Sequence, residues 1–150
     1  MNDMESMAAI ESIKQLKARY FRCLDTGDWA GMETVFAPDL VADISQAVME
    51  HHEKEPIRGG RTFARFIQSS VDGLVTVHHG HMPEIKLTSP TTATGIWAME
   101  DKLWKKKPST STLPFEFLHG YGHYHETYEK IGGTWRIKTW KLTRLRLDIV

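Results

Sequence analysis

Tyr20-Phe21-Arg22-Cys23-Leu24-Asp25 is the stretch of sequence around which the predicted fold is organised. It ends a predicted first helix, residues 5–25, whose apolar side chains recur every three or four positions and so form one buried stripe. Asp25 lies four residues after Phe21, on the edge of that stripe, where an ionised carboxylate needs a cation or a hydrogen-bond donor. Arg22 offers one local partner at i,i+3, which would make a weak helix-end ion pair. A partner from elsewhere in the chain is the alternative.

The rest of the chain predicts two more helices and then a run of strands. A short second helix is expected from Asp28 to Phe36, ending before Pro38, and a third helix covers residues 61–70. Strands are expected at residues 39–45, 74–87, 91–105, 115–130 and 134–148, with a hairpin turn at 131–133. Helices followed by antiparallel strands predict a single α+β domain over residues 1–150. We expect a long, strongly curved, mostly antiparallel sheet that wraps the helices and leaves a cone-shaped cavity.

Charge and cysteine content limit the possible partners. Nineteen basic and nineteen acidic residues give a formal net charge of zero, so no overall field attracts nucleic acid or an anionic membrane. Cys23 is the single cysteine, which excludes an intramolecular disulfide and indicates a reducing compartment. The N-terminus lacks a signal-peptide pattern, and no stretch is long and apolar enough to span a bilayer. We therefore expect a cytoplasmic protein with no nucleic-acid or membrane partner.

A histidine-rich strand follows the third helix. His78 and His79 must face opposite sides of a sheet, and His81 shares the side of His79. Pro83 cannot donate to a strand ladder and indicates a sheet edge or a bulge. In one interpretation His78 is a general base and Asp25 orients its ring, because a carboxylate fixes the tautomer of an imidazole and raises its basicity.

Two other interpretations of the histidines remain open. They are structural, each satisfied by hydrogen bonds, or they hold a metal ion, with His79 and His81 joined by His123 and His125 of the third long strand. His51 and His52 are adjacent and point apart, so a solvated loop is expected there. We predict that the protein has no metal site.

The chain resembles the bile acid 7α-dehydratases of gut bacteria. The resemblance is carried by Tyr20 to Asp25, by Gly80-His81-x-Pro83-Glu84-Ile85, by 91–97 and by 100–103, and it runs from about Ile10 to Arg144. That family belongs to the SnoaL-like, nuclear-transport-factor-2-like (NTF2-like) cone fold, alongside scytalone dehydratase and steroid Δ5-isomerase. The resemblance implies the same cone, with three N-terminal helices packed in the curved sheet.

The resemblance also implies roles for individual residues. Tyr20, Asp25 and His78 match the family's catalytic tyrosine, aspartate and histidine, and Arg144 matches an arginine implicated in substrate binding, with Arg146 as the alternative position. Ile44 stands where the family has a second pocket tyrosine. Further expected pocket residues, each with core packing or a structural role as the alternative, are Phe66, Trp97, His125 and Trp140.

These residues predict a cofactor-independent lyase, such as a dehydratase, or an isomerase. It would act on a hydrophobic, polycyclic or steroid-like substrate, with a coenzyme A thioester left open. A non-catalytic small-molecule binding module and a structural subunit like the small subunit of ring-hydroxylating dioxygenases are the alternatives. Because a large apolar side chain of the Trp97 or the Ile96 set must face outward, we also predict a homodimer or homotrimer formed through the sheet.

Overall fold

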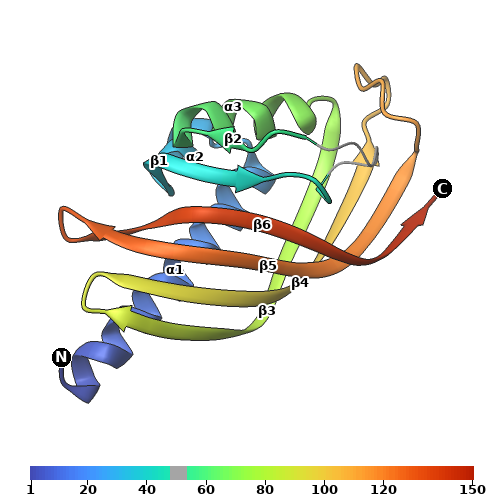
Figure 1. Ribbon diagram of the computed structural model, residues 1–150. Coiled ribbons are helices and arrows are strands. Elements are labelled where there is room, and N and C mark those ends of the chain that lie inside the picture. The colour runs from blue at the N-terminus through green and yellow to red at the C-terminus, as the bar shows by residue number, and fades with distance from the viewer. Residues whose placement is uncertain (48–53) are drawn as a thin grey trace.

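The computed structural model describes residues 1–47 and 54–150, as three helices and a six-stranded sheet (Figure 1). The helices are α1 (Asp3–Thr26), α2 (Trp29–Glu33) and α3 (Gly60–Ser70). The strands, in chain order, are β1 (Phe36–Asp43), β2 (Ile57–Arg58), β3 (Leu74–Ser89), β4 (Thr92–Lys105), β5 (Phe117–Ile131) and β6 (Thr134–Ile149). No helix of the described ranges is long and apolar enough to cross a membrane.

The long helix α1 has clear signals at both ends. Asn2 and Glu5 form a capping box, in which each side chain accepts a hydrogen bond from the other residue's backbone N–H. Gly27 ends the helix in the left-handed conformation, at φ 70°, which glycine adopts without strain. Between these ends Ile13, Leu16 and other members of the stripe are buried, so the predicted amphipathic helix is confirmed.

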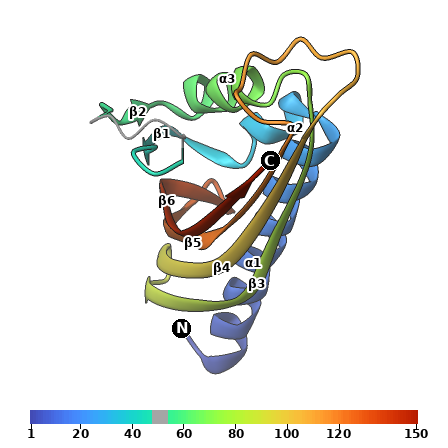
Figure 2. The ribbon, with the colours of Figure 1, turned by 90° about the vertical axis from the view of Figure 1, so that its right-hand side faces the viewer.

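The sheet has the order β2-β1-β6-β5-β4-β3, and only the β1–β6 pair is parallel. The four long strands bend together, and α1 and α3 lie on the concave side (Figures 1 and 2). This arrangement confirms the predicted α+β cone with a curved, mostly antiparallel sheet. Strand β3 forms one edge of the sheet, and its register shifts between Gly80 and Pro83, as the proline indicated.

The predicted second helix is too long. Helix α2 ends at Glu33, and β1 begins at Phe36 instead of Asp39. Phe36 is buried because β1 is inserted between β2 and the first half of β6, and this pairing outweighs the helical pattern of the local sequence. Pro38 is accommodated in the strand because it falls within the register shift between Phe36 and Val41.

Glycine allows α1 to approach β3 closely. A Cβ atom at Gly80 would lie 2.6 Å from Phe21 Cε2, which is far inside van der Waals contact. The bare backbone of Gly80 therefore lets the last turns of α1 lie directly against β3. Because Gly80 follows His78 by two residues, the same contact brings Asp25 within reach of His78.

Candidate active site

Asp25 and His78 form a hydrogen-bonded pair. The Asp25 Oδ1 atom lies 2.7 Å from His78 Nδ1, and Asp25 Oδ2 accepts from the backbone N–H of His78 at 2.8 Å. The hydroxyl of Thr76 donates to Asp25 Oδ1 at 2.9 Å. Asp25 lies in the last turn of α1, where the helix dipole disfavours a negative charge, and these three donors offset that cost. Arg22 is exposed, so the partners of Asp25 come from β3.

The pairing fixes the chemistry of the His78 ring. An ionised carboxylate only accepts hydrogen bonds, so Nδ1 carries the hydrogen and Nε2 keeps its free lone pair. Thr76 and His78 share the inner face of β3, and His79 is exposed on the outer face. The free nitrogen of His78 is thus available for proton abstraction on the inside of the cone.

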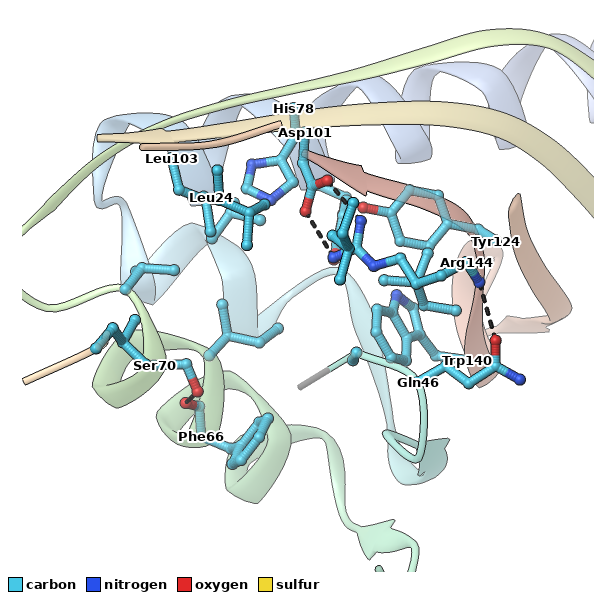
Figure 3. Close-up of a pocket in the computed structure, with 18 of the residues that line it drawn as sticks. Leu24, Gln46, Phe66, Ser70, His78, Asp101, Leu103, Tyr124, Trp140 and Arg144 are labelled. Carbon is cyan, nitrogen blue, oxygen red and sulfur yellow. Dashed lines mark hydrogen bonds and ion pairs between the residues drawn. The ribbon is translucent and has the colours of Figure 1, made fainter. Parts of the chain in front are cut away.

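His78 lines a cavity of about 220 Å³. Figure 3 shows His78 and Asp101 on one wall, with Phe66 and Ser70 of α3 on the opposite side. The remaining walls are mostly apolar and include Ile67, Leu118, Trp140 and Leu142. Because the lining is mostly apolar and its charged groups, Asp101 and Arg144, lie on the same side as His78, the cavity fits a hydrophobic molecule with one or two oxygen atoms.

Asp101 and Arg144 form a bidentate ion pair beside His78 (Figure 3). The Arg144 Nη1 and Nη2 atoms donate to the two Asp101 oxygens at 2.6 and 2.9 Å. Asp101 is the neighbour of His78 in the β3–β4 ladder. Among the described residues, Arg144 Nε is buried without a hydrogen-bond partner. A buried N–H without a partner is costly, so this group can donate a hydrogen bond to a molecule bound in the cavity.

Tyr20, Tyr124 and Trp140 form the aromatic floor of the cavity. Burial, followed by the Glu126 charge, raises the pKa of Tyr20, and the neighbouring Tyr124 hydroxyl and Trp140 indole partly oppose this rise. Tyr20 therefore stays protonated and is suited to donating a hydrogen bond. The indole N–H of Trp140 is also buried without a well-formed hydrogen bond in the described part of the chain.

A buried ion pair lies beneath this floor, and the sequence analysis did not predict it. Lys17 on α1 pairs with Glu126 on β5, and neither side chain is exposed. The Lys17 ammonium lies 3.9 Å from the ring centroid of Tyr20 and 3.6 Å from that of Tyr124. The available signal was the position of Lys17, which follows Ile13 by four residues and so falls within the apolar stripe.

The structure brings part of the predicted site together. Tyr20, His78, Phe66, Trp140 and Arg144 line the cavity, and Asp25 supports His78 from behind. Arg146, the alternative to Arg144, is exposed and pairs with Asp148.

Three predicted pocket residues lie elsewhere. Ile44 is buried in the core and does not line the cavity. Trp97 is also buried, and its indole N–H donates to the Tyr128 hydroxyl at 2.9 Å. His125 lies on the outer side of β5, where Nε2 is 2.9 Å from the Thr143 hydroxyl oxygen. Buried residues of β5 alternate with half-buried ones, and His125 belongs to the second set.

The described residues contain no group of three or more histidine, cysteine or acidic side chains arranged to hold a metal ion. His51 and His52 lie outside the residues that the structure describes.

A family model described as a SnoaL-like domain matches residues 5–141. The chain is a member of the SnoaL-like family. A curated relative, a probable cyclase named FGR4 from Gibberella zeae, is 24% identical over 93% of this chain and 93% of its own. The narrower resemblance to bile acid 7α-dehydratases stays a prediction.

Solved structures share the fold of this SnoaL-like protein at low sequence identity. One, from Novosphingobium aromaticivorans, is proposed to be a scytalone dehydratase; it is 16% identical, with a TM-score of 0.80 over 99% of this chain and 92% of its own. Another is a hexachlorocyclohexane dehydrochlorinase, LinA type 2, which is 14% identical, with a TM-score of 0.79 over 99% of this chain and 93% of its own. These similarities establish the NTF2-like cone.

Proposed function

We propose that this SnoaL-like protein is a cofactor-independent lyase or isomerase that removes a proton from a hydrophobic cyclic substrate. The observation that carries the proposal is the His78–Asp25 pair, whose free Nε2 lies on the inner side of an apolar cavity. Relatives and structural neighbours named as a cyclase, a scytalone dehydratase and a dehydrochlorinase support activity of this general class.

Proton abstraction is assigned to His78. Its Nε2 takes a proton from a carbon next to a carbonyl group, and the electrons of that C–H bond enter an enolate. The Asp25 carboxylate stabilises the imidazolium that results and holds the ring in place. The chemistry thus needs only the side chains of this chain.

The developing negative charge on the substrate oxygen requires hydrogen-bond donors. Tyr20, Trp140 and Arg144 all line the cavity, and within the described part of the chain the Trp140 indole N–H and Arg144 Nε are buried without hydrogen-bond partners. Donors fixed in a water-poor cavity stabilise such a charge strongly. In a dehydration, the leaving hydroxyl departs with its bonding electrons and takes the proton from His78 as water. In an isomerisation, His78 returns the proton to another carbon.

The substrate that fits this arrangement is a ketone or enone on a fused-ring, steroid-like skeleton. The aromatic and aliphatic walls match such a skeleton, and the Asp101–Arg144 ion pair and His78 supply the charged and basic groups of the lining. A thioester carbonyl of a coenzyme A conjugate would meet the same donors.

The test is deuterium exchange at carbon, which needs no knowledge of the product. The protein is incubated in D₂O with a panel of bicyclic and steroidal ketones and enones, and incorporation is followed by mass spectrometry. We expect deuterium to enter at one or more carbon positions of at least one panel member, and we expect His78→Ala to reduce the rate of incorporation about 10²–10⁴-fold. His79→Ala is the matched control, because this neighbouring histidine is exposed on the outer face, and it should leave the rate unchanged. Binding of panel members without any exchange would favour the binding-module alternative.

A further inference from the structure

The Asp25–His78 pair lies between two separate cavities. His78 lines the substrate cavity and Asp25 does not. Asp25 instead lines a second cavity of about 230 Å³, on the far side of the pair. Leu24 and Val71 belong to the walls of both cavities and so form the partition between them.

The second cavity is polar where the first is apolar. Besides Asp25 it is lined by Thr76, Gln68, Asp72 and Lys106, and by turn backbone at Gly27 and Gly73. The charged groups that line this cavity with Asp25 are thus Asp72 and Lys106. On the other side, Asp101, Arg144 and Tyr20 line the substrate cavity with His78. Such a lining suits water and small oxyanions and disfavours a hydrophobic substrate.

The two side chains of the pair also differ in solvent exposure, and the one that lines the polar cavity is the more exposed. The Asp25 side chain is 22% exposed, although three donors hold it, and the His78 side chain is 8% exposed. Asp25 Oδ1 accepts from Thr76 and His78 Nδ1, and within residues 1–47 and 54–150 Oδ2 accepts only the backbone N–H of His78. A carboxylate oxygen has room for a further donor, so a water molecule in the second cavity can bind Oδ2.

We propose that the second cavity is a proton exit that connects Asp25 to solvent while substrate fills the first cavity. The imidazolium Nδ1–H passes its proton to Asp25, and the resulting carboxylic acid gives it to water in the second cavity. The ring is left neutral as its Nε2–H tautomer, and the water leaves as hydronium or passes the proton on. After product release, Nε2–H gives its proton to water in the emptied substrate cavity and Nδ1 takes a proton back through Asp25, which restores the free Nε2.

The proton-transfer part of this inference rests on the proposed function. The exit matters most for an elimination whose leaving group departs as a weakly basic anion, such as a halide or a carboxylate. Such an anion does not carry away the proton that His78 has taken, so without the exit the ring stays a charged imidazolium until the product has left. The access that the cavity gives to Asp25 is independent of any reaction.

Three consecutive residues at the end of α3 provide a matched test. Gln68 lines the second cavity, Ser70 lines the substrate cavity, and Ser69 lines neither; all three are exposed. Gln68→Trp therefore places a bulky side chain at the mouth of the exit, and Ser70→Trp places the same side chain at the substrate cavity. Ser69→Trp places it at neither cavity.

The measured quantity is the exchange rate of the His78 Nδ1–H with water, followed by NMR on protein labelled with ¹⁵N-histidine. We expect Gln68→Trp to slow this exchange about tenfold, a barrier change of about 1.4 kcal/mol. Ser69→Trp and Ser70→Trp should leave the rate within about twofold, a change below about 0.5 kcal/mol. Slower exchange in Ser70→Trp but not in Gln68→Trp, or no change in any variant, would overturn the proposal.

A second measurement uses formate as a small carboxylate in place of the Asp25 side chain. In Asp25→Gly, formate should bind and restore the ¹⁵N signals of the His78 ring, and Gln68→Trp should weaken this binding about tenfold or more, or about 1.4 kcal/mol. If formate does not bind, or if Ser70→Trp weakens formate binding and Gln68→Trp does not, the proposed exit is contradicted. Neither measurement uses a substrate, so a protein that passes both and exchanges no carbon-bound deuterium refutes the proposed function and leaves the access to Asp25 intact.

Discussion

Replacing Lys17 by Met is the substitution whose cost the structure defines best. Lys17 and Glu126 are both fully buried, and Lys17 also contacts the rings of Tyr20 and Tyr124. Methionine fills a similar volume without the charge, so Lys17→Met leaves the Glu126 carboxylate buried with one remaining donor among the residues that the structure describes. That donor is the Tyr128 hydroxyl, 2.6 Å from Glu126 Oε2.

The expected loss follows from the uncompensated charge. Removing one partner of a buried ion pair costs about 3–5 kcal/mol of the free energy of unfolding, because the other charge stays out of water. Glu126→Gln keeps an acceptor for the Tyr128 hydroxyl and removes the charge. The double variant Lys17→Met/Glu126→Gln should therefore be more stable than Lys17→Met alone, by about 2 kcal/mol.

Urea denaturation followed by circular dichroism measures these differences. Lys14→Met is the matched control: Lys14 lies on the same helix and is exposed, so its replacement should change the free energy of unfolding by less than about 0.5 kcal/mol. Two results would refute the reasoning. One is a loss below about 1 kcal/mol in Lys17→Met, and the other is a double variant whose loss equals the sum of the two single losses.

Three further predictions follow from the same structure. Burial lowers the pKa of Lys17 from 10.5 to about 8, against the opposing attraction of Glu126. Between about pH 8 and 10 the folded protein therefore binds fewer protons than the unfolded chain, so its free energy of unfolding relative to that of Lys17→Met should rise with pH, by up to about 1.4 kcal/mol per pH unit. Urea titrations across this range measure the difference, and a flat or falling difference would be inconsistent with the lowered pKa. A Cβ atom at Gly120 would lie 2.2 Å from both Arg144 Nη1 and Asp101 Oδ1, so Gly120→Ala should cost about 1–3 kcal/mol in thermal unfolding, and an unchanged midpoint would show that the ion pair shifts freely. The outer face of the sheet exposes apolar side chains such as Ile96, which is 40% exposed. We therefore expect the protein to form a homodimer or homotrimer through this face; sedimentation equilibrium measures the mass, and a single monomeric species would contradict the expectation.

The sequence was informative where one local pattern determines the position of a side chain. The apolar stripe of α1 placed Asp25 at the edge of the core, and strand alternation separated His78 from His79. Pro83 marked the irregular edge of β3. The contact between Asp25 and His78, 53 residues apart, could therefore be predicted from local rules and the family resemblance.

Features that depend on distant pairing could not be predicted in this way. Phe36 has a helical context locally, and only the insertion of β1 between β2 and β6 makes it a strand residue. Lys17 and Glu126 are separated by 109 residues, so neither sequence context shows the partner. The placement of His125 depends on which face of β5 turns inward, which the whole sheet sets. Trp97 shares the buried face of β4 with Asp101, and its placement depends on how far along the strand the cavity extends.

The central claim is that His78 and Asp25 act as one proton-abstracting unit. The most direct measurement is the rate of deuterium incorporation into the most reactive ketone of the panel, for the wild-type protein, His78→Ala, Asp25→Asn and the double variant. Residues that act as a unit give strongly non-additive losses. We predict that the double variant exchanges as slowly as His78→Ala alone, about 10²–10⁴-fold below wild type. Losses that multiply in the double variant, or a His78→Ala protein that keeps the wild-type rate, would contradict the claim.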